Sequence, residues 1–164
     1  MSSLDQLLQT FDEAWSYRCE SITDVLEGVT PEEAQWQHHS YAEEQGYEDE
    51  PPAGTILWQI AHLAHAARHY QEVLRLRPVV MEPRTEMPFA SNLAEWSEAL
   101  ERYSRELRKY VATLSEDDLL QPCARDMNVG EFVRMAIRHM TWHAGQIAVA
   151  RRLYRDYKQH MTIK

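Results

Sequence analysis

The chain has 164 residues, of which 44% are hydrophobic, and this is enough to fill one sizeable core, so we expect a single domain over residues 1–164. Its formal net charge is −9, and no cluster of Lys or Arg interleaved with aromatic residues is present, so we expect no nucleic-acid partner. No apolar run reaches the roughly 18 residues that span a bilayer, and the N-terminus lacks the layout of a signal peptide, so we expect no membrane partner and a cytoplasmic location.

Glycine is scarce and the apolar residues recur at helical spacing, which predicts an all-α protein. The first helix is expected over about 4–26, because Gly28 and Pro31 follow it. A second helix is expected to begin at a Thr55 cap and to stop before Pro78. It carries two stripes that should face inward, so we expect it to contact neighbours on two sides. The stripes are Ile56, Ile60, Leu63, Ala67, Tyr70 and Leu74, and Trp58, His62, His65, His69, Val73 and Leu76.

The third helix is expected to start after an Asn92 cap and to repeat apolar residues as far as Leu114. The fourth is expected to start near Asn128, with Glu131 three residues later, and to run to about Tyr154. Four amphipathic helices predict a four-helix bundle, in which metal sites are built from side chains on facing helices. Long crossover connections join them at 28–54 and 78–92. The first contains an acidic stretch that we expect to be a solvated loop: Glu43, Glu44, Glu48, Asp49 and Glu50.

Two histidines occupy the face of the fourth helix that should point into the core. His139 and His143 are four residues apart, so their side chains emerge roughly 5–6 Å from each other on one side of the helix. At this spacing both imidazoles can bind one metal ion. The alternative is a pair of core histidines that form hydrogen bonds to their neighbours.

A third nitrogen would have to come from the second helix. His62, His65 and His69 share one of its inward stripes, and any one of them could supply it. They cannot all bind the same ion, because His62 and His69 lie roughly 10 Å apart along the axis. Spacing alone leaves His62 and His65 as alternatives. Three histidines with a vacant coordination position are typical of catalytic divalent metals.

Two strings of the chain resemble the DinB/YfiT-like metalloenzyme family. They are W-Q-I-A-H-L-A-H at 58–65 and H-M-T-W-H-A-G-Q at 139–146, the latter preceded by N-V-G-E-F at 128–132. The resemblance implies a bundle in which His62, His139 and His143 bind a divalent ion, usually nickel or zinc, and it selects His62 rather than His65. Members of that family include S-transferases that use bacillithiol or mycothiol and a mycothiol-dependent maleylpyruvate isomerase.

Further residues are expected to contribute to the site or to its surroundings. Gln146 lies on the stripe of His139 and could orient a ligand catalytically, or cap the site structurally. Arg18 interrupts the apolar face of the first helix and could bind a carboxylate of a thiol cofactor, or lie at the rim. Gly145 is expected to permit close helix packing. Two tryptophans, Trp58 and Trp142, are expected to wall the pocket, while three histidines are expected to be exposed: His38, His39 and His160.

These observations favour a metal-dependent enzyme that acts on a small-molecule substrate, with a low-molecular-weight thiol as a candidate cofactor. The alternative is a non-catalytic metal-binding or stress-response bundle. Because the second helix carries two apolar stripes and the third is strongly patterned, one face of the bundle should need a cover, and we expect a homodimer.

Overall fold

The computed structural model describes residues 1–17, 20–40, 51–87 and 90–162. Helices account for the regular structure of these residues, with no strand among them, which confirms the all-α class. An isolated antiparallel bridge between Pro122 and Asn128 closes the turn before the last helix. No helix in this part of the chain combines the length and hydropathy needed to cross a membrane.

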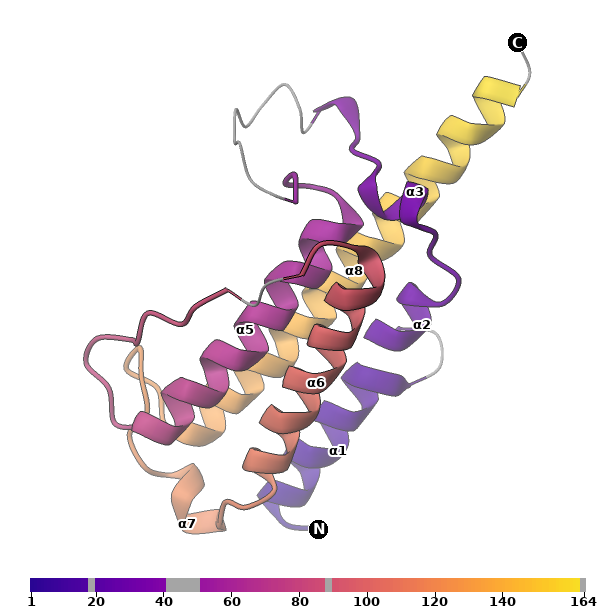
Figure 1. Cartoon of the computed structure of the whole chain (residues 1–164). Helices are drawn as coiled ribbons and strands as arrows, with labels where there is room; N and C mark the ends of the chain where they lie inside the picture. Colours follow the sequence, from indigo (N-terminus) through magenta and orange to yellow (C-terminus); the bar gives the residue numbers. More distant parts are fainter. Residues whose placement is uncertain (18–19, 41–50, 88–89, 163–164) are drawn as a thin grey trace.

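Four long helices lie side by side and form the bundle (Figure 1). They are α1 (Ser3–Ser16), α5 (Ile56–Leu76), α6 (Leu93–Val111) and α8 (Val129–Thr162). Helix α5 packs against α6 and α8, and α1 packs against α8 and α6. Side chains from all four helices are buried between them, among them Phe11, Ile60, Leu63, Leu100, Phe132 and Ile147. The predicted four-helix bundle is therefore confirmed.

Three of the predicted helix starts are confirmed by their caps. The Thr55 hydroxyl accepts a hydrogen bond from the Trp58 amide at 3.0 Å, and the Asn92 side chain accepts one from the next turn of α6. The Asn128 side chain accepts a hydrogen bond from the Glu131 amide at 2.8 Å, and the Glu131 carboxylate accepts one from the Asn128 amide at 2.9 Å. This reciprocal pattern is a capping box. These caps set where α5 and α8 begin, and so they set the register of the histidines.

The predicted first helix is wrong in its extent, because α1 ends at Ser16 and a separate helix α2 spans Ile22–Leu26. Tyr17 takes extended backbone angles, and the Ser21 hydroxyl caps α2 by accepting from an amide of its first turn. The local cap therefore prevails over the continuous apolar pattern. Arg18 lies outside the described residues. Helix α6 ends at Val111, three residues before the predicted end, and α8 continues past Tyr154 to Thr162.

The first long connection is partly helical and is attached to α8. Helix α3 (Pro31–Gln35) is capped by Thr30, and its buried Glu33 pairs with Arg151 of α8 at 2.9 Å. The same guanidinium donates to the backbone carbonyls of Val25 and Glu27. Helix α3 lies beside the C-terminal half of α8 (Figure 1), and Trp36, which follows α3, contacts Tyr154 of α8 with ring centroids 5.7 Å apart. The acidic stretch predicted at 43–50 lies outside the described residues.

The described start of the second long connection contacts α5, because residues 82–86 form hydrogen bonds to His65, Arg68 and His69. After α6, a short helix α7 (Glu116–Leu119) with a Ser115 capping box leads into the turn before α8. Arg77 joins these regions, because it donates to Asp118 at 2.9 Å and to Tyr110 at 2.7 Å. These contacts attach α7 to the C-terminal end of α5 and to α6.

Candidate metal centre

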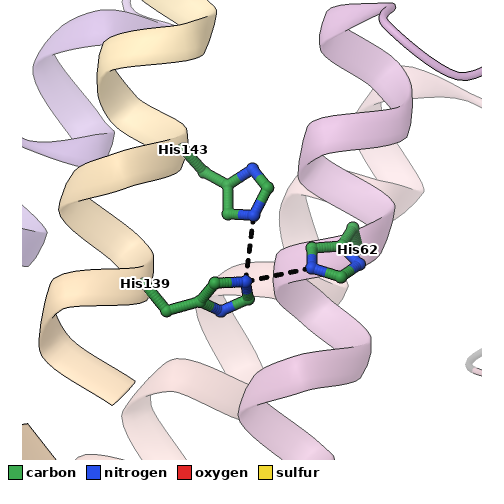
Figure 2. A group of neighbouring side chains, drawn as sticks. All are labelled: His62, His139 and His143. Carbon is green, nitrogen blue, oxygen red and sulfur yellow. Dashed lines mark hydrogen bonds between the residues drawn. The ribbon is translucent and has the colours of Figure 1, made fainter. Parts of the chain in front are cut away.

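Three imidazoles converge between α5 and α8 (Figure 2). The Nε2 atom of His139 lies 3.1 Å from Nε2 of His62 and 3.0 Å from Nε2 of His143. One nitrogen from each of the three rings lies within 4.8 Å of the others. The i, i+4 spacing on α8 supplies two rings, and α5 supplies the third from the facing helix. The structure thus brings together the three residues that the sequence singled out.

The separations suit a small divalent cation. Zinc–nitrogen bonds of about 2.0–2.1 Å in tetrahedral geometry place two ligand nitrogens roughly 3.3 Å apart. The two separations that involve His139, 3.0 and 3.1 Å, fall just below that value. For these two pairs, a cation between the rings requires an outward shift of only a few tenths of an ångström.

The nitrogens on the far sides of two rings are fixed by neighbours on α5. Nδ1 of His143 donates a hydrogen bond to the side-chain oxygen of Gln59, so this nitrogen carries the proton and Nε2 presents its lone pair. Nδ1 of His139 is hydrogen-bonded to the Tyr70 hydroxyl at 3.1 Å. Such partners orient metal-binding histidines and set their tautomer.

Hydrogen bonds alone do not account for the close approach of the three Nε2 atoms. Nε2 of His139 faces two other Nε2 atoms, yet a neutral ring nitrogen offers either one proton or one lone pair. Because His143 already presents a lone pair, at least one of the close approaches lacks a proper donor or acceptor. A cation that accepts three lone pairs removes this conflict, so the residues present fit a divalent metal ion.

The rings are also neutral at physiological pH. Burial lowers the pKa of His139 to about 4 and that of His143 to about 3, with further lowering from the neighbouring histidines. Burial likewise lowers the pKa of His62. Neutral imidazole is the form that binds metal, so protons compete weakly for these nitrogens.

His65 and His69 do not take part in the cluster, and the expectation that their whole stripe faces the bundle core is wrong. His65 Nε2 donates to the Thr85 carbonyl at 3.0 Å. His69 contacts the Thr85 hydroxyl at 2.9 Å through Nδ1 and Glu82 at 2.7 Å through Nε2. Both rings therefore hold the connection between α5 and α6, which leaves His62 as the histidine of α5 in the cluster.

Gln146 lies one turn after His143, and its side-chain oxygen is buried without a hydrogen-bond partner among the described residues. Gln146 acts to raise the pKa of His143, although burial lowers it by more, so the two side chains are neighbours. Gly145 does not serve close packing, because a Cβ added there meets no atom within 4 Å. Trp58 stacks on His62 with ring centroids 4.9 Å apart, whereas Trp142 is 67% exposed.

A cavity of about 420 Å³ lies beside the cluster, and Gln59 belongs to both, since it also binds His143. Its lining residues are Trp36, His38, Gly54, Gln59, Trp142, Gly145, Gln146, Val149, Ala150 and Leu153. His38 is half-buried here, with its ring 5.8 Å from that of Trp36, so the expectation that it is exposed is wrong. His39 and His160 are exposed, as expected.

Three residues near the cluster or in the cavity wall were not predicted as site residues from the sequence: Gln59, Tyr70 and Trp36. A signal existed for the first, because Gln59 precedes His62 by three residues and so shares its side of α5. Tyr70 was assigned to the core, where it is indeed buried, but its hydroxyl reaches His139 across the helix interface. Trp36 came from a connection with no periodic pattern to place it.

No curated protein and no solved structure matched the chain, whereas one protein family did. The sequence profile of the DinB superfamily matches residues 7–147, which include most of the bundle and all three clustered histidines. The chain therefore belongs to the DinB superfamily.

Proposed function

We propose that this protein is a divalent-metal-dependent enzyme that acts on a small molecule, with His62, His139 and His143 as the metal ligands. The observation that carries the proposal is the convergence of three neutral, oriented Nε2 atoms within 4.8 Å of one another. Imidazole donors suit nickel and zinc, which are the two ions we propose.

The donor set favours a catalytic ion over a structural one. Structural zinc sites are closed by four protein ligands, whereas catalytic sites keep a position for water or substrate. Among the described residues, the cluster offers three nitrogens and no fourth His, Cys, Asp or Glu. The helices are held together by apolar packing around buried Phe132 and Ile147, so the fold has support that does not depend on an ion.

When bound, the ion would act as a Lewis acid that lowers the pKa of a water or thiol at its vacant position. The residues of the chain supply orientation. Gln59 and Tyr70 hold the rings of His143 and His139. The buried oxygen of Gln146 is a hydrogen-bond acceptor without a partner among the described residues. We propose that it orients a proton-bearing group of the reactant.

We propose a low-molecular-weight-thiol-dependent S-transferase or isomerase as the reaction class. Membership of the DinB superfamily and the absence of a catalytic cysteine from the cluster support it. In this proposal the thiol is the nucleophile and Arg18 binds a carboxylate of the thiol.

The test is thiol transfer to 1-chloro-2,4-dinitrobenzene, followed by absorbance, with bacillithiol, mycothiol and glutathione each offered to the metal-loaded protein. We expect conjugation with at least one thiol, its loss in His139→Ala, and a decrease of about tenfold or more in Gln146→Ala with the metal content retained. Maleylpyruvate is offered in parallel with each thiol as the isomerase assay. A metal-loaded protein that accelerates neither reaction would favour the non-catalytic metal-binding bundle.

A further inference from the structure

The cavity beside the histidine cluster has walls from three separate parts of the chain. Trp36 and His38 follow α3, Gln59 belongs to α5, and Trp142 and Gly145 belong to α8. Its volume of about 420 Å³ lies within the range of about 300–1,000 Å³ found for small-molecule sites. A cavity of this size takes a ligand of one or two fused rings.

The described part of the lining is mostly apolar. None of the ten described residues that line the cavity is Lys, Arg, Asp or Glu, although charged residues make up 26% of the sequence. The polar groups in the wall are the side chains of His38, Gln59 and Gln146. A charged ligand would lose hydration here without gaining a Lys, Arg, Asp or Glu partner from the described lining, whereas an uncharged ligand does not carry that cost.

Two tryptophans from different parts of the chain line the cavity, Trp36 after α3 and Trp142 on α8. Trp142 leaves 67% of its surface exposed, which is a large apolar area for a residue on a packed helix. Trp36 is held in place by edge contacts with Tyr154 at 5.7 Å and by Tyr157 at the same distance. Two indoles in one cavity wall, one of them packed against two tyrosines, offer apolar aromatic surface for a planar ring.

The cavity is coupled to the histidine cluster through two amide side chains. Gln59 lines the cavity and also accepts the hydrogen bond from His143, and Gln146 lines it while its oxygen is buried beside the same ring. A ligand in the cavity therefore lies next to the proposed metal position.

From these observations we propose that the cavity binds an uncharged ligand with an aromatic body, and that this ligand is the apolar substrate of the metal-dependent reaction. The second half of this proposal, that the ligand is the substrate, rests on the function proposed above. Among the described residues of this wall, a thiol that carries carboxylates has no Lys or Arg partner.

The experiment is ligand-observed NMR titration of the full-length protein with two probes that share a ring system, 2-naphthalenemethanol and 2-naphthoate. We expect the neutral alcohol to bind at least tenfold more tightly than the carboxylate. Gly145→Leu should weaken binding of the alcohol at least tenfold, because the new side chain enters the cavity and its Cβ meets no atom within 4 Å. The same variant should melt no lower than wild type, since leucine favours a helix more than glycine does.

Arg134→Leu is the matched control, because it adds the same side chain at an exposed position of α8 about 16 Å away along the axis. It should bind the alcohol as wild type does. Equal binding of naphthoate, or unchanged binding in Gly145→Leu, would overturn the proposal. So would a second copy over the cavity, seen as a mass of twice 19.3 kDa together with no probe binding.

Repeating the titration with His139→Ala separates this proposal from the metal proposal. Retained binding of the alcohol by a variant that has lost its metal supports the cavity as an independent binding site. A wild-type protein that binds the alcohol but no metal contradicts the proposed function and leaves the ligand class of the cavity standing. A wild-type protein with metal and no probe binding overturns the cavity proposal alone.

Discussion

The ion pair between Arg151 and Glu33 offers a test of how the wall of the cavity is held. Its N–O distance is 2.9 Å, and the two side chains are 14% and 7% exposed. The guanidinium also donates to the carbonyls of Val25 and Glu27 at 2.9 Å each. Arg151→Met keeps the alkyl chain but leaves a buried carboxylate and two carbonyls without their donor.

Removing one partner of a buried pair costs about 3–5 kcal/mol, so we expect a loss of about 3 kcal/mol or more in the free energy of unfolding. For a domain of this size that corresponds to a fall of roughly 6–12 °C in melting temperature. Urea and thermal unfolding followed by circular dichroism measure both quantities. Adding Glu33→Gln to the variant should recover at least about 1 kcal/mol, because it removes the unpaired charge.

Arg105→Met is the control, since the pair of Arg105 with Glu101 is 59% and 61% exposed and spans 3.8 Å. It should change the free energy of unfolding by less than about 0.5 kcal/mol. A loss below about 1 kcal/mol in Arg151→Met would refute the reasoning, because it would mean that the attachment of α3 to α8 contributes little to the fold.

Three further outcomes follow from the structure. A chelator at about pH 7.5 should leave the helical circular dichroism intact, since the core is apolar, while it lowers the melting temperature by the lost binding energy. Hydrogen bonds from Arg125 lower the pKa of Glu82 from 4.5 to about 2, so this carboxylate stabilises the fold above pH 4.5 and its contribution is lost as the pH falls towards 2. Glu82→Gln should therefore be less stable than wild type near pH 7, and urea titrations should show the difference vanish by about pH 2. Gly145→Ala should raise the free energy of unfolding by up to about 1 kcal/mol, because alanine favours a helix and its Cβ meets no atom within 4 Å. Gly28→Ala should lower it by about as much, because Gly28 has a φ of 69°. Thermal melts that rank the two variants the other way would contradict this.

Local chemistry explains which parts of the fold the sequence predicts. The starts of α5, α6 and α8 follow from Thr55, Asn92 and Asn128, whose caps need residues no more than three positions away. The break between α1 and α2 was missed, because the apolar periodicity continues through Ser21 while the cap interrupts it. Periodicity reports which face is buried, and it does not report whether the backbone stays helical.

The candidate metal site likewise has a part that local spacing predicts and a part that it does not. Spacing on one helix predicts that His139 and His143 can share an ion, but the choice between His62 and His65 depends on Thr85, which is 20 residues along the chain from His65. That carbonyl is supplied by an irregular connection, so no helical pattern predicts it. The resemblance to the DinB family selected His62, and the convergence of the three rings agrees with that selection.

The proposed metal centre is tested most directly by elemental analysis of untagged protein and of four alanine variants. The account predicts one divalent ion per chain in the wild type and its loss in His62→Ala, His139→Ala and His143→Ala, because two imidazoles alone form a weak site. His65→Ala should keep most of the ion, since its ring binds the Thr85 carbonyl. Full metal in both His139→Ala and His143→Ala, or loss in His65→Ala with retention in His62→Ala, would contradict the assignment.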